Sequence, residues 1–318
     1  MPKKIKQDNK ETRSYQLHGL SNYFEDLVNL YKKKKFPKVL LLTGEKGIGK
    51  YTLTFHLINF FLSDQNNPYN LKNKLINEEN IFYKQIISNT SQNFFYIPNE
   101  KQKKTGIDDI RELKKKLNNS TLNNLPRFII FDDVEYLNIN AANSMLKLIE
   151  EPSNTNFFIL INNKKNIILE TIKSRSIEFK IFLKDSDKKS IFDKLSKHHG
   201  LENHFSHEYI NFTSPGLLIK FSELLNKNNI DIQTSFYDAT SIFLEKFKKT
   251  KNEILLDCIN FFLEIKSSKI HQKINNNFIM SIQKKNDIMK LLYNYKKFNL
   301  TNNAVLDYIK KSTINNYV

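Results

Sequence analysis

The sequence of 318 residues contains a single cysteine, Cys258, and no tryptophan. One cysteine excludes a disulfide framework within the chain and a zinc site built from paired cysteines. Glycine and proline are scarce, at seven each, and no apolar stretch approaches the roughly 20 residues of a membrane-spanning helix. The first ten residues are polar and basic, so we expect no signal peptide, no membrane partner and a cytoplasmic protein.

Positive charge, by contrast, is abundant. Lysine and arginine number 50 against 33 acidic residues, which gives a formal net charge of +17 at pH 7. Such a charge suits an anionic partner such as nucleic acid. The basic residues are scattered along the chain, however, and heavy use of Lys, Asn and Ile is also what an AT-rich coding sequence produces. Charge alone leaves both interpretations open.

The most informative stretch lies near the middle of the chain. Two dense apolar runs, 128–131 and 157–161, predict strands that are buried on both faces, with an amphipathic helix between them. Asn140 is expected to cap that helix. Strand, helix and strand in this order indicate a parallel sheet, whose carboxyl edge is where such sheets bind ligands. Asp132 and Asp133 end the first strand at that edge.

A second strand-to-helix connection lies nearer the N-terminus. The apolar run 39–42 is followed by GEKGIGK and then by an apolar helical pattern. In a phosphate-binding loop, Gly44, Gly47 and Gly49 would permit the tight backbone turn, and Lys50 would reach the outer phosphates.

The residue after Lys50 departs from that motif. A phosphate-binding loop carries Ser or Thr there, whose hydroxyl binds Mg²⁺, but this chain has Tyr51. Thr52 is the nearest candidate hydroxyl, although one residue turns the side chain by about 100° around a helix. The alternative is a retained loop that only connects strand and helix.

After residue 179 the pattern changes to helices alone. We therefore predict a basic, disordered tail over 1–14 and an α/β domain over 15–179. A small helical domain over 180–229 and a larger helical domain over 230–318 complete the predicted chain.

The run AANSMLKLIEEP, followed by TIKSRS, resembles the clamp-loader branch of the AAA+ ATPases, and within it the delta-prime subunits of bacterial DNA polymerase III. The resemblance implies an AAA+ P-loop domain, a helical lid and a helical collar that joins a ring of subunits. It implies gamma/tau and delta subunits, the sliding clamp and primed DNA as partners. It also implies a cofactor site for ATP and Mg²⁺, here degenerate. Related subunits carry a four-cysteine zinc module, which would fall within 63–92; this segment has no cysteine, so we expect no zinc.

The same resemblance assigns roles to individual residues. Arg175, in the SRS run, would act as an arginine finger on ATP held by a neighbouring subunit; the alternative is an internal salt bridge, for example with Glu178. Asp132 stands where a carboxylate organises Mg²⁺, and Asp133 replaces the glutamate that polarises water, one methylene too short. For these two acids the alternative is a simple strand end. Asn163 matches the sensor position by its distance from Arg175, and Asn162 is the alternative.

We therefore predict a non-hydrolysing or weakly nucleotide-binding clamp-loader subunit that supplies Arg175 in trans and helps load the sliding clamp on primed DNA. The alternative within the same complex is an ATP-hydrolysing motor subunit of the gamma/tau type, which Tyr51 argues against. A standalone P-loop kinase would leave the SRS run and the C-terminal helices unexplained. A DNA-binding protein acting alone would bind DNA tightly and in a salt-dependent manner.

Overall fold

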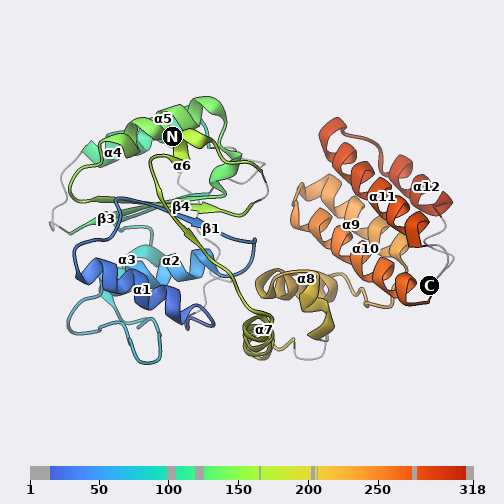
Figure 1. Cartoon of the computed structure of the whole chain (residues 1–318), viewed down its shortest axis with the longest axis horizontal. Coiled ribbons are helices and arrows are strands. Elements are labelled where there is room, and N and C mark those ends of the chain that lie inside the picture. Colours follow the sequence, from blue (N-terminus) through green and yellow to red (C-terminus); the bar gives the residue numbers. More distant parts are fainter. Residues whose placement is uncertain are drawn as a thin grey trace. The chain divides into compact units, whose positions relative to one another are not determined.

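The computed structural model describes residues 15–98, 105–118, 125–164, 166–201, 205, 207–273 and 278–312. The predicted tail over 1–14 lies outside the described residues. The chain divides into two compact units, one ending at Asp187 and the other beginning at Lys188 (Figure 1). The predicted boundary between a lid and a collar at residues 229–230 stays a prediction.

The first unit is built on a five-stranded, fully parallel sheet with the order β2-β3-β4-β1-β5. Its strands are β1 (Val39–Thr43), β2 (Phe94–Pro98), β3 (Arg127–Asp132), β4 (Asn156–Asn162) and β5 (Ile177–Lys180). The three inner strands are almost entirely buried, as their dense apolar runs predict. The α/β fold class is therefore confirmed.

Helices cover both faces of this sheet, with α1–α3 on one side and α4–α6 on the other (Figure 1). They are α1 (Ser21–Lys32), α2 (Lys50–Phe61), α3 (Ile81–Ile87), α4 (Ile107–Asn118), α5 (Ile139–Glu150) and α6 (Glu170–Lys173). Each face has its own hydrophobic core, because alternate residues of a strand point to opposite faces. Leu40 and Leu42 thus pack toward α1 and α2, whereas Leu41 packs in the core on the side of α5.

The start of α5 corrects one prediction. Its capping residue is Asn138, whose side-chain oxygen accepts a hydrogen bond from the Ala141 backbone N–H at 2.8 Å. Asn138 has extended backbone angles, as a cap requires, whereas Asn140 already lies within the helix. The prediction of Asn140 was wrong because the helix begins two residues earlier, with the exposed Ile139.

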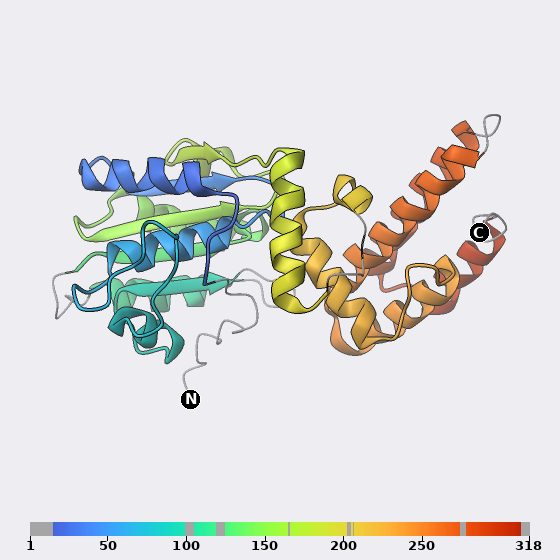
Figure 2. The same cartoon turned by 90° about the horizontal axis from the view of Figure 1, so that it is seen from below.

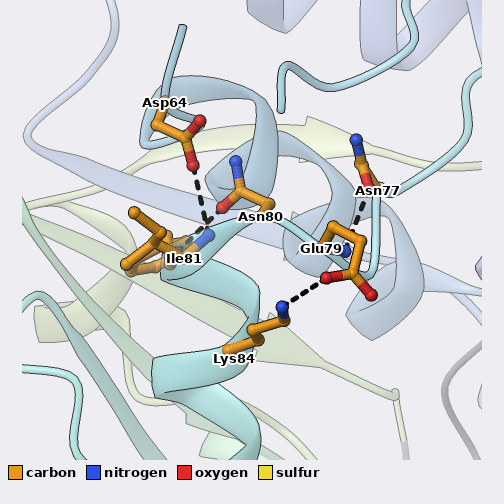
Figure 3. Close-up of polar contacts among 7 residues, drawn as sticks. Asp64, Asn77, Glu79, Asn80, Ile81 and Lys84 are labelled. Atoms are coloured by element: carbon orange, nitrogen blue, oxygen red, sulfur yellow. Dashed lines mark hydrogen bonds and ion pairs between the residues drawn. The ribbon is translucent and has the colours of Figure 1, made fainter. Parts of the chain in front are cut away.

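Side-chain hydrogen bonds close the loop between α2 and α3 (Figure 3). Asp64 accepts from the backbone N–H groups of Asn67 (2.7 Å) and Ile81 (3.1 Å), and these bonds lower the pKa of its carboxyl. Asn80 caps α3 and also donates to the Asn67 carbonyl at 2.8 Å. The start of α3 is therefore fixed by polar contacts to the first part of the loop that follows α2. Tyr69, deeper in the loop, is bonded to the buried ring of His56 at 2.8 Å.

The second unit contains helices and no strand among its described residues; it is the yellow-to-red part of Figure 2. Its helices are α7 (Asp185–His199, which begins at the unit boundary), the 3-10 helix η3 (His207–Asn211), α8 (Pro215–Lys227), α9 (Phe236–Thr250), α10 (Ile254–Lys273), α11 (Phe278–Phe298) and α12 (Asn302–Lys311). One hydrophobic core joins them, and Cys258 is completely buried within it. Across the described ranges, no helix combines the length and apolar character needed to cross a membrane.

Candidate functional site

The glycine-rich loop connects β1 to α2, as the sequence predicts. Gly47 and Gly49 have φ angles of 84° and 96°, in the left-handed region that favours glycine. At Gly44 the restriction is space, because an added Cβ would lie 2.6 Å from Ile48 Cδ1 and 2.7 Å from the Ile181 carbonyl oxygen. All three predicted glycines are thus required by the backbone of this loop.

Lys50, the first residue of α2, is folded against its own loop. Its side chain is buried, and its Nζ donates to the Gly44 carbonyl oxygen at 2.8 Å and to that of Glu45 at 2.7 Å. Burial lowers the pKa of Lys50 to about 8, although the nearby charges of Asp132 and Glu135 act in the opposite direction. The ammonium group therefore already has two acceptors from within its own chain.

The acidic residues at the end of β3 are held in place by their neighbours. Tyr96 of β2 donates its hydroxyl to Asp132 Oδ2 at 2.9 Å, and the Asp133 N–H donates to Asp132 Oδ1 at 2.9 Å. Burial and the charge of Asp133 raise the pKa of Asp132 to about 6. Asp133 itself adopts φ 51°, a left-handed conformation that few residues other than glycine take.

Asn163, the predicted sensor, meets these acids from the end of β4. Its Nδ2 donates to Asp133 Oδ1 at 2.6 Å, and its backbone N–H donates to Glu135 Oε1 at 3.0 Å. Glu135 is buried and was missed by sequence reasoning. Its signal was available, because it is the third acid in the run DDVE that leaves the strand. The structure therefore brings Lys50, Asp132, Asp133 and Asn163 together at one edge of the sheet and adds Glu135.

Tyr51 fills the position of the expected Ser or Thr with an aromatic ring. The ring stacks on Phe55 at a centroid distance of 6.1 Å and meets Tyr96 edge-on at 5.0 Å. Tyr96 is the residue whose hydroxyl is bonded to Asp132, so both Mg²⁺-ligand positions belong to one aromatic and polar cluster. Thr52 is half-buried one position further along α2. Among the described residues, no group of three or more His, Cys, Asp or Glu side chains is arranged to hold a metal ion.

Arg175 lies apart from this cluster. It follows α6 and precedes β5, whose residue Ile177 pairs with Leu40 near the start of β1, whereas the loop with Lys50 follows the end of β1. Because the strands are parallel, Arg175 lies at the amino edge of the sheet. The glycine-rich loop with Lys50 lies at the opposite, carboxyl edge. Residues 40–43 of β1 alone span about 10 Å between these edges.

The Arg175 side chain is partly exposed, at 38%, and forms an ion pair with Glu150 at the end of α5. Its Nε lies 2.9 Å from Glu150 Oε1, and its Nη1 donates to the Thr171 carbonyl at 3.1 Å and to Ser174 Oγ at 3.3 Å. Arg175 does form an internal salt bridge, as the alternative predicts, but its partner is Glu150 and not Glu178.

A parallel sheet with a glycine-rich loop after β1, acids ending β3 and an asparagine ending β4 defines a P-loop domain of the AAA+ class. Within that class, the chain belongs to the family described as "DNA polymerase III, delta subunit", whose model matches residues 19–184. The resemblance to delta-prime subunits that the sequence indicates is confirmed by this match and by named relatives.

The chain is similar to the protein named DNA polymerase III subunit delta' of Buchnera aphidicola subsp. Acyrthosiphon pisum, at 26% identity over 89% of this chain and 85% of the relative. The subunit of the same name from Buchnera aphidicola subsp. Schizaphis graminum is 25% identical over 54% of each chain. That from Escherichia coli is 27% identical over 48% of this chain and 44% of the relative. The matched segments thus span about half of two of these relatives. A solved DNA polymerase III gamma subunit-related protein from Thermotoga maritima has 17% identity and a TM-score of 0.48, covering 91% of this chain and 99% of that one.

Proposed function

We propose that this chain is a clamp-loader subunit of the delta-prime type. In this role it hydrolyses no ATP itself, supplies Arg175 in trans to ATP held by a neighbouring subunit, and helps place the sliding clamp on primed DNA. Membership of the DNA polymerase III delta subunit family supports the class of complex. The mechanism is a further step, and it is supported by where the charged side chains lie.

The observation that carries the proposal is the position of Arg175. An arginine that served its own nucleotide would have to reach the loop that contains Lys50, but Arg175 lies at the opposite edge of the sheet. Its side chain is partly exposed and its charge is permanent. A phosphate that Arg175 contacts would therefore have to be held by another chain, where a fixed positive charge stabilises the phosphoryl transition state.

The residues at the chain's own loop fit Mg²⁺-dependent hydrolysis poorly. Tyr51 places a ring, and not a short hydroxyl side chain, where Mg²⁺ would need a ligand, and Asp132 is engaged by Tyr96. Asp133, the shorter substitute for a water-polarising glutamate, is bonded to Asn163. Each of these three positions thus either carries a different residue from the one expected or is hydrogen-bonded to a neighbouring side chain. We therefore propose weak nucleotide binding at most.

The second candidate is a motor subunit of the gamma/tau type. Relatives named DNA polymerase III subunit gamma, from Buchnera aphidicola, and tau, from Bacillus subtilis, are 24% and 27% identical to the chain over 62% and 51% of its length. A motor would depend on its own Lys50 and on a Mg²⁺ ligand after it. Tyr51 removes that ligand, so the non-hydrolysing candidate is preferred.

Partners follow from the same proposal. The helices of the second unit would pack in a collar with gamma/tau and delta subunits, and the net charge of +17 would favour proximity to primed DNA. The sliding clamp would be bound by the assembled complex.

The test is ATP hydrolysis by the complex reconstituted with its motor subunit, the clamp and primed DNA. Arg175→Ala should lower single-turnover hydrolysis at the neighbouring site by on the order of 10³-fold or more, the size known for arginines supplied in trans. Arg111→Ala is the matched control, because Arg111 is an exposed arginine of α4 whose ion pair is with Asp108 of the same helix. Equal rates for both variants in assembled complexes would refute the proposal.

Lys50→Ala separates the two candidates in the same assay. A motor subunit would lose its own hydrolysis, so total turnover of the complex would fall. The non-hydrolysing subunit should leave turnover unchanged once the amount of assembled complex is matched by gel filtration.

A further inference from the structure

The guanidinium group of Arg175 is held at two of its three nitrogen atoms. Glu150 binds Nε, and the backbone carbonyl of Thr171 and the hydroxyl of Ser174 accept from Nη1. No acceptor for Nη2 exists among the residues that the structure describes. The group thus has a fixed plane, and Nη2 remains available for an anion from outside the chain.

Glu150 is well suited to fix that plane. It is the last residue of α5, and its neighbour Ile149 is buried in the core against the sheet, so the backbone at this point is anchored. A carboxylate at a helix C-terminus is electrostatically unfavourable because the helix end carries partial negative charge. The positive charge of Arg175 offsets this cost, which favours the pair over the separated side chains.

The adjacent Glu151 offers a direct comparison. It has the same charge and is also exposed, but it makes no hydrogen bond or ion pair with any described residue. The contact with Arg175 therefore depends on the position of Glu150 and not on a general negative charge at this end of α5.

We propose that Glu150 is a positioning residue for Arg175. It holds Nε so that the Nη2 end points away from its own chain, toward phosphate oxygens presented by a neighbouring subunit. This inference rests on the proposed function, because it concerns how the trans-acting arginine is presented. A long arginine side chain loses rotamer freedom when it binds, and a side chain that is already ordered loses less.

The geometry distinguishes positioning from concealment. An autoinhibitory carboxylate would engage Nη2 as well, through a bidentate pair, and would leave no nitrogen of the guanidinium for an outside oxyanion. Glu150 instead binds Nε and leaves Nη2 available. Removal of the carboxylate should therefore reduce the contribution of Arg175 to hydrolysis and not increase it.

The test uses the reconstituted complex and four variants: Glu150→Ala, Glu150→Gln, Glu151→Ala and Arg175→Ala. An exposed ion pair has a small effect, so Glu150→Ala should lower kcat of the neighbouring site roughly twofold to fivefold. The KM for ATP should stay the same, since the arginine acts in the transition state. Glu150→Gln should recover part of the rate, because its amide oxygen still accepts from Nε, and Glu151→Ala should match the unmodified chain.

A double variant makes the dependence on Arg175 explicit. Glu150→Ala should have no further effect on kcat when Arg175 is already alanine, because the carboxylate acts only through the arginine. An equal additional loss in both backgrounds, a rate for Glu150→Ala equal to that for Glu151→Ala, or a rate above that of the unmodified chain would overturn the inference while leaving the proposed function intact. No effect of Arg175→Ala would overturn the proposed function first.

Discussion

Lys50 and Arg175 are both cations that the family resemblance assigns to phosphate contacts, yet their surroundings differ in nearly every respect. Lys50 is 3% exposed and bonded to carbonyl groups of its own loop, whereas the Arg175 side chain is 38% exposed and held by a surface carboxylate. Burial lowers the pKa of Lys50, while the guanidinium of Arg175 keeps its charge. The first region has become part of the core of its unit, and the second has remained a surface feature.

If the proposed function is correct, this difference shows how a subunit can keep the fold of a nucleotide-binding domain while a neighbouring subunit carries out hydrolysis. The loop, Lys50 and the acids are connected by hydrogen bonds and packed rings, so their removal would damage the fold. Arg175 contributes little to that network. Substitutions in the two regions should therefore separate effects on stability from effects on function.

The largest effect on stability is expected for Lys50→Ala. Two carbonyl oxygens of the loop lose their donor, so the free energy of unfolding should fall by about 2 kcal/mol. Arg175→Ala should change it by less than about 0.5 kcal/mol, as is usual for a surface substitution. Urea denaturation measures both, with Lys35→Ala as an exposed lysine control. A larger loss for Arg175→Ala than for Lys50→Ala would contradict the comparison.

The shifted pKa values of Asp132 and Lys50 also predict a pH dependence. The pKa of Asp132 is raised to about 6, so between about pH 4 and 6 the folded chain binds more protons than the unfolded chain, and stability should fall as the pH rises. The pKa of Lys50 is lowered to about 8, so stability should rise again from about pH 8 to 10.

Urea denaturation at several pH values measures these slopes. The decline between pH 4 and 6 should be absent in Asp132→Asn, whose amide oxygen still accepts from Tyr96. The rise above pH 8 should be absent in Lys50→Met. A decline that persists unchanged in Asp132→Asn would assign it to another carboxyl group.

Tyr96→Phe should have the next largest effect. It removes the hydroxyl that donates to the half-buried Asp132, so the free energy of unfolding should fall by about 1.5 kcal/mol near pH 7, the lower end for a bond to a charged group. Tyr83→Phe is the matched control, because the Tyr83 hydroxyl donates to a neutral group, the hydroxyl of Tyr15, at 3.1 Å. Equal losses of unfolding free energy in the two variants would mean that the bond from Tyr96 to Asp132 stabilises the fold no more than a bond between neutral hydroxyls.

The smallest effect concerns the helix that carries Glu150. Asn138→Ala removes the cap of α5 and should cost about 1 kcal/mol in thermal or urea denaturation. Asn140→Ala, two residues further along on the exposed surface, should change stability by a few tenths of that amount at most. A larger loss for Asn140→Ala than for Asn138→Ala would instead support Asn140 as the capping residue, as the sequence predicts.

Much of the first unit could be predicted from the sequence because its signals are local. The runs 39–42, 128–131 and 157–161 are too apolar for half-exposed strands, and three glycines around Lys50 have few uses other than a tight loop. Asp132 and Asn163 follow directly from those strands, since parallel strands end at one edge.

The contacts that decide the chemistry could not be predicted in this way, because they join residues far apart in the chain. Tyr51 meets Tyr96 from the neighbouring layer, and Arg175 meets a glutamate 25 positions earlier. Glu178 was the suggested partner because it is close to Arg175 in the sequence. However, β5 begins at Ile177, and Glu178 belongs to this strand. Such contacts depend on how strands and helices are stacked, which no local pattern specifies.

If Arg175 acts on a neighbouring subunit, the pairing of β5 with β1 would give it a mechanical support as well. Arg175 stands just before β5, and residues Leu40 to Thr43 of β1 pair in register with Ile177 to Lys180. A pull exerted on the arginine by a moving neighbour would therefore act as shear along this ladder, with several backbone hydrogen bonds loaded together. Paired strands resist shear because several hydrogen bonds must break at once. The arginine would therefore stay in place while the neighbouring subunit moves against it.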